Sequence, residues 1–101
     1  KQSKQKQSAM ACDIVYEGMA MWASIQLLYS MGEAYYAWIQ EQLAAIRNDV
    51  YGIGFRLYRD RYGLIKNGEE PAFTPFVSFP PLDPEEVRKI FREEDTDGLN
   101  K

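Results

Sequence analysis

An apolar seven-residue repeat runs through the first half of the chain. Its positions alternate in steps of three and four, and none of them carries a charged residue. This spacing is typical of a long helix that presents one continuous seam to other helices. The seam residues are Val15, Gly18, Trp22, Ile25, Tyr29, Gly32, Tyr36, Ile39, Leu43, Ile46, Val50, Ile53 and Leu57. We therefore expect these residues to form an interface between helices.

Two glycines interrupt the aromatic part of this seam. Gly18 and Gly32 alternate there with Trp22 and Tyr29. Each glycine costs about 1 kcal/mol in a helix interior relative to alanine. We expect an offsetting contact at both positions, in which a neighbouring helix approaches the backbone closely.

Other faces of the same stretch are also apolar. A helix that is apolar nearly all round has to be buried nearly all round. If it is continuous over residues 8–48, it is about 60 Å long, and the remaining segments are too short and too polar to cover it. The additional apolar residues are Ile14, Met21, Leu27, Leu28, Met31, Tyr35 and Trp38. This predicts association with other copies of the chain or with other subunits of an assembly.

The pattern between residues 51 and 68 fits two kinds of element. Tyr51, Ile53, Phe55 and Leu57 alternate as in a strand, which leaves a hairpin open. Aromatic residues also recur there at helical spacing, up to Tyr58 and Tyr62. We favour a helix that is kinked or broken at Gly52 and Gly54, because glycine weakens a helix interior.

That helix predicts a face that is both basic and aromatic. Arg56, Tyr58, Arg59 and Arg61 are its candidate polar contacts, and Arg56 is spaced to pair with Asp60. Arginine and tyrosine suit nucleic acid, since they bind phosphates and stack on exposed bases. The net charge of −3 and the pI of 4.9 give no broad positive field, however. A protein partner therefore fits this face better than nucleic acid does.

The chain changes character after Asn67 and Gly68. Five prolines exclude a regular helix or a central strand, while three phenylalanines keep the stretch apolar. We expect residues 69–83 to form an extended arm that lies along its own long helix or reaches over a neighbouring subunit. Its candidate interface residues are Phe73, Phe76 and Phe79.

A short helix over residues 84–94 has the clearest start signal. Asp83 is placed as an N-cap, Pro84 takes the first helical position, and Glu85 and Glu86 lie at the positive end of the dipole. Residues 95–101 form an acidic tail, and residues 1–8 a polar tail that we expect to be disordered. The fold class is mainly α, with the long helical region at residues 9–68 forming one or two helices.

Composition argues against catalysis. The 101 residues include no histidine, one cysteine and no glycine-rich phosphate loop, so we expect no catalytic residue, no cofactor and no metal site. The run from Glu85 to Gly98 resembles the entry helix and first loop ligands of an EF-hand. In that register Asn100 stands where the loop requires glycine, which argues against a calcium site.

Three functional classes follow from these patterns. We favour a non-enzymatic structural subunit of a larger assembly, such as a virion or a similar complex. The alternatives are an adaptor that uses the face over residues 55–62 and a small membrane protein with a span at residues 18–40, in which polar residues such as Gln26 interrupt the apolar run. Asp13 and Glu17 argue against a classical secretion signal, and the lone Cys12 fits a reducing cytoplasm or the interior of a large particle.

Overall fold

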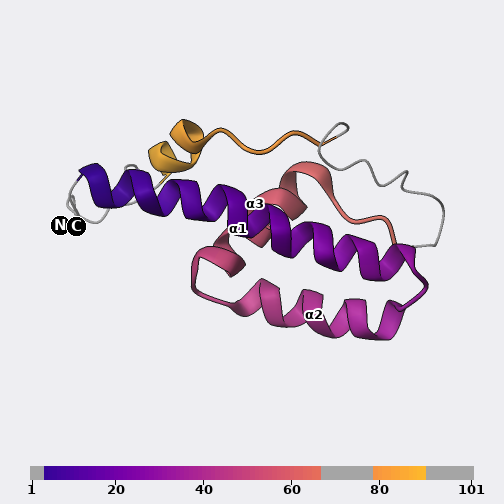
Figure 1. Cartoon of the computed structure of the whole chain (residues 1–101). Helices are drawn as coiled ribbons and strands as arrows, with labels where there is room; N and C mark the ends of the chain where they lie inside the picture. The colour runs from indigo at the N-terminus through magenta and orange to yellow at the C-terminus, as the bar shows by residue number, and fades with distance from the viewer. Residues whose placement is uncertain (1–3, 67–78, 91–101) are drawn as a thin grey trace.

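The structure is a computed structural model that describes residues 4–66 and 79–90. Three helices make up the first range: α1 (Lys4–Ser30), α2 (Ala34–Ile46) and α3 (Val50–Tyr62). Residues 84–90 form a further short helix. In Figure 1, α2 runs back beside α1, α3 crosses behind α1, and residues 79–90 lie along the other side of α1. The described part is thus entirely helical apart from its connections, as the sequence predicts.

The long helix ends earlier than the apolar repeat predicts. Gly32 has a φ of +80°, a left-handed conformation that suits glycine. Its N–H donates to the Tyr29 carbonyl (3.2 Å), and the N–H of Glu33 donates to the Leu28 carbonyl (2.9 Å). These two bonds form a Schellman motif, which satisfies the last carbonyls of α1. The expectation of one helix through residues 8–48 is therefore wrong. Gly32 ends a helix, and among the described residues no packing atom lies within 4 Å of where its Cβ would stand.

The break between α2 and α3 also differs from the prediction. It lies at residues 47–49, because Asp49 caps α3 by accepting a bond from the Gly52 N–H (3.0 Å). Helix α3 then continues through Gly52 and Gly54 without a break, so the helical reading of this stretch is confirmed and the strand alternative is wrong. Arg56 donates to the carbonyls of Ala45 (3.0 Å) and Arg47 (2.7 Å) at the end of α2 instead of pairing with Asp60.

Helices α1 and α3 make the main packing contact of the fold. They cross where Gly18 faces Gly54, and a Cβ atom on either glycine would overlap the backbone of the other helix. The expectation of a close helix contact at Gly18 is thus confirmed, with the partner helix in the same chain. Both glycines are buried.

Aromatic residues hold the returning segment, residues 79–83, on this pair of helices. Phe79 packs edge-on against Trp22 (5.3 Å between ring centroids) and against Tyr62 (5.2 Å). The buried Tyr58 hydroxyl donates to the Val15 carbonyl (2.8 Å) and accepts from the Leu82 N–H (3.0 Å). This part of the predicted arm therefore lies on its own chain.

The short helix begins as predicted. The side chain of Asp83 accepts a bond from the Glu85 N–H (3.0 Å), and the helix is described to residue 90. At the other end of the chain, α1 already begins at Lys4. The prediction that residues 4–8 are disordered is therefore wrong, because lysine and glutamine are good helix formers. Residues 1–3, the rest of the predicted short helix, the acidic tail, Phe73 and Phe76 lie outside the described residues.

Candidate functional site

The apolar seam is divided between the interior and the surface. Its α1 members are buried in the core of the chain: Val15, Gly18, Trp22, Ile25 and Tyr29. The next members are exposed, apart from the half-buried Ile39: Gly32, Tyr36, Leu43 and Ile46. The last three, Val50, Ile53 and Leu57, are half-buried on α3. The first part of the predicted interface is therefore used inside the fold, and only the part on α2 is free.

Helix α2 has its small residues inside and its large apolar residues outside. Ala37 and Ala44 are 0% and 1% exposed. On the opposite side, five large side chains are between 51% and 78% exposed: Tyr35, Tyr36, Trp38, Leu43 and Ile46. Together with Ile39, we call these residues the outer face of α2. A helix on a self-contained domain normally has the reverse arrangement.

The inner side of α2 is fixed by a buried carboxylate. Glu41 accepts a hydrogen bond from the Tyr29 hydroxyl (2.5 Å) and forms an ion pair with Lys66 (3.1 Å). Burial, followed by the hydrogen bond with Glu41 and its negative charge, raises the pKa of Tyr29 to about 12. Because a buried carboxylate is costly without partners, these contacts determine which side of α2 turns inward.

The outer face of α2 carries no charge. Glu41 is the only charged residue in the helix, and it points inward. The flanking residues are charged: Glu33 lies just before the helix and Arg47 just after it. Arg47 also pairs with Asp49 (2.6 Å). An uncharged apolar strip between two opposite charges suits contact with protein better than contact with water or with a small charged ligand.

The apolar repeat leaves out Tyr35 and Trp38, which the sequence places instead among the additional apolar residues expected to be covered by other chains. It assigned the same helical phase to residues on both sides of Gly32, although α1 and α2 are separate helices with independent orientations. The signal that could have placed them is the spacing of Ala37, Glu41 and Ala44, a narrow stripe that faces the fold.

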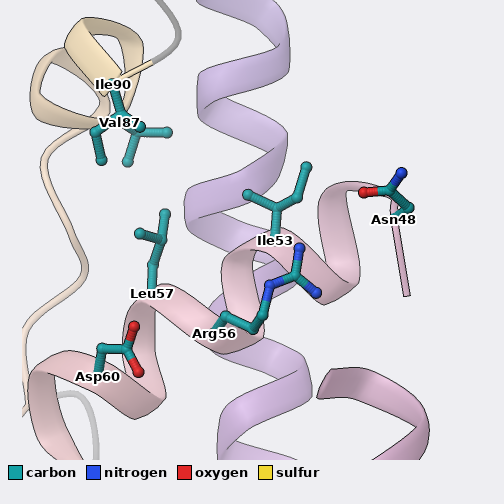
Figure 2. A pocket seen from close by; sticks show the side chains of 7 residues that line it. All are labelled: Asn48, Ile53, Arg56, Leu57, Asp60, Val87 and Ile90. Atoms are coloured by element: carbon teal, nitrogen blue, oxygen red, sulfur yellow. The ribbon is translucent and has the colours of Figure 1, made fainter. Parts of the chain in front are cut away.

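A hollow lies between α3 and the short helix over residues 84–90. Its volume is about 340 Å³. Figure 2 shows Val87 and Ile90 on the short helix facing Leu57 on α3, with Ile53 nearby. Asn48, Arg56 and Asp60 line its polar side. The arrangement forms a groove with one apolar and one polar side.

The predicted basic aromatic face does not form as one surface. Tyr58 is fully buried, because its hydroxyl bonds to two backbone groups of the core. Arg56 points back to the end of α2, Arg59 pairs with Asp60 (3.2 Å), and Arg61 pairs with Glu86 (3.4 Å). Tyr58 therefore does not share a surface with the three arginines, and the adaptor alternative stays a prediction.

The proposed membrane span does not form one helix, because residues 18–40 include the turn between α1 and α2. Over residues 4–66 and 79–90, no helix reaches the length and apolar character that crossing a membrane requires. Within the same residues, no cluster of three or more acidic, cysteine or histidine side chains is placed to hold a metal ion.

Comparisons with protein families, with curated proteins and with solved structures found no match.

Proposed function

We propose that this chain is a non-enzymatic subunit of a multi-chain assembly and that it associates through the outer face of α2. One observation carries the proposal: α2 turns Ala37 and Ala44 into the fold and five large apolar residues to solvent. Tyr36 and Leu43 are each more than half exposed, so they contribute little to the core of the single chain. A binding role accounts for them.

The size and composition of this face support the proposal. Monomeric proteins rarely expose contiguous apolar patches of more than a few hundred Å². Tyrosine and tryptophan are enriched where proteins bind each other, because they contribute much contact area at little entropic cost. The outer face of α2 contains two tyrosines and one tryptophan within four residues, Tyr35–Trp38.

The test is the solution mass of the chain, measured by light scattering after size exclusion at low and high salt. We expect a defined multimer that persists at high salt, since apolar contacts are not screened. Leu43→Glu and Ile46→Glu should reduce the mass to that of the monomer while circular dichroism still reports the helical content.

The matched control is Tyr16→Glu. Tyr16 is an exposed aromatic residue on α1, 64% exposed against 61% for Tyr36. Tyr36→Glu should weaken association and Tyr16→Glu should not. A chain that remains monomeric at every concentration, or a multimer that all three α2 variants leave intact, contradicts the proposal.

A further inference from the structure

We propose that the partner is a second copy of this chain and that two copies pair through the outer faces of α2, with the two helices antiparallel about a two-fold axis. This inference rests on the proposed function and deepens it, because it names the partner and the arrangement. It rests on three properties of α2: its charge distribution, its sequence of side-chain sizes and its exposed area.

The absence of charge on the outer face favours self-contact. Two identical charged faces would repel each other, whereas this face places no charge against its own copy. A helix that binds a membrane surface usually carries lysine or arginine on its polar side. Helix α2 contains neither, and its inner side is covered by α1 and α3. A second protein surface of the same apolar kind is therefore the better match.

The charges at the two ends select the antiparallel orientation. Glu33 lies at the N-terminal end of α2 and Arg47 at the C-terminal end. The helix of 13 residues is about 20 Å long. Antiparallel pairing places Glu33 of each copy near Arg47 of the other and opposes the two helix dipoles. Parallel pairing would place Glu33 against Glu33, whereas at the other end Arg47 is already paired with Asp49 of its own chain (2.6 Å).

Side-chain sizes support the same orientation. The aromatic residues lie in the first part of α2, and Leu43 and Ile46 in the last part. With the two-fold axis level with residues 40–41, Tyr35 of one copy faces Ile46 of the other, and Ile39 lies near Leu43. Large rings then pack against aliphatic side chains, whereas a parallel pair would stack identical rings at one end.

The exposed area is sufficient for a small dimer interface. The five large exposed side chains offer roughly 630 Å² on each copy, taking about 200 Å² for a whole large side chain and the exposed fractions given above. Specific interfaces bury about 600–1,000 Å² on each partner. A symmetric pair of α2 helices falls within that range.

Disulfide crosslinking tests the orientation directly. In a Cys12→Ser background, Tyr35→Cys and Ile46→Cys are made as single variants and mixed under mild oxidation. We expect the mixture to give a covalent dimer and each single variant alone to give almost none, because a disulfide requires Cα atoms about 4.4–6.8 Å apart. Each variant then carries a single cysteine, so no disulfide can form within one chain.

A second pair, Ile39→Cys mixed with Leu43→Cys, tests the same register near the axis. The solution mass of every variant is first measured under reducing conditions. A failure to crosslink is then counted only for variants that still form the dimer. If Tyr35→Cys or Ile46→Cys prevents the dimer from forming under reducing conditions, the orientation is judged from the second pair of variants.

The outcomes separate this inference from the proposed function. Crosslinking of Tyr35→Cys with itself means a parallel pair and overturns the inference alone. A multimer that forms no crosslink at either pair also overturns it, because the contact then lies elsewhere, for example at the groove beside Leu57. A wild-type monomer overturns both. Binding of that monomer to neutral or anionic phospholipid vesicles would identify a membrane surface as the occupant.

Discussion

The closest approach between helices depends on two residues. Gly18 and Gly54 bring the backbones of α1 and α3 together, and an added methyl group would meet main-chain atoms that cannot move aside. We predict that Gly18→Ala lowers the free energy of unfolding by about 1–3 kcal/mol, despite the better helix propensity of alanine. Urea denaturation measures the change. Ser24→Ala on the exposed side of α1 is the control and should stay within about 0.5 kcal/mol.

A single hydroxyl group connects three parts of the chain. Tyr58 bonds to Val15 on α1 and to Leu82 in the returning segment, and both bonds are buried. We predict that Tyr58→Phe costs about 1–3 kcal/mol, because it leaves two backbone groups unsatisfied. Tyr62→Phe is a matched control, since its hydroxyl donates to the Pro80 carbonyl (2.7 Å) at an exposed site. It should cost less than about 1 kcal/mol, and equal losses would contradict the prediction.

Tyr29 gives the chain a stability loss at high pH. Burial, then the bond with Glu41, raises its pKa to about 12, while the unfolded chain has a tyrosine pKa of about 10. The unfolded state releases this proton first, so the contribution of Tyr29 is complete below about pH 10 and is lost as the pH rises to about 12. Unfolding free energies measured across this range should fall more steeply for wild type than for Tyr29→Phe. Identical slopes would contradict the role of Tyr29.

At the scale of elements, α2 has two faces with different requirements. Its inner face is fully packed around Ala37 and Ala44, while its outer face is exposed in the single chain. We predict that Ala44→Leu lowers the free energy of unfolding by about 1–3 kcal/mol, because the added volume has no space. Leu43→Ala should change the stability of the monomer by less than about 0.5 kcal/mol. Denaturation at a concentration below association measures both, and a large loss at Leu43 would mean that it packs within the chain.

The sequence predicts the type of each element better than its boundaries. Local chemistry was sufficient where the sequence around a residue fits only one structural role. Asp83 is an example, because its side chain caps the short helix. It was insufficient at Gly32, because a glycine in an apolar repeat fits both a close helix contact and a helix end. Gly18 takes the first role and Gly32 the second, and only tertiary packing separates them.

The candidate site was predicted in part for the same reason. The repeat identified Tyr36, Leu43 and Ile46, which are exposed on α2, but it also included Trp22 and Tyr29, which fill the core. Periodicity reports that a face is apolar and not which partner covers it. Once α1 and α2 are separate helices, the stripe of Ala37, Glu41 and Ala44 determines which face turns outward.

At the scale of the whole molecule, α1 and α3 form the rigid centre to which the other parts attach. Trp22 illustrates this role: it stacks on Tyr58 (5.9 Å between centroids), and its indole N–H donates to the Gly63 carbonyl (2.8 Å). Gln26 then holds Ile65 by two hydrogen bonds, of 2.9 and 2.8 Å. The outer face of α2 is therefore carried on a scaffold with a buried core of its own, which suits a preorganised interface.

The short helix over residues 84–90 is expected to be the least stable described element. It is anchored by Val87 and the preceding Leu82, Ile90 is 40% exposed, and a hollow of about 340 Å³ separates it from α3. Short helices are marginal without packing, so this segment should open locally without global unfolding. In hydrogen exchange, we predict that its amides exchange faster than those beside Gly18 and Gly54. Val87→Ala should accelerate exchange in this helix and leave the centre of α1 unchanged, and equal protection throughout would mean that the chain opens only as a whole.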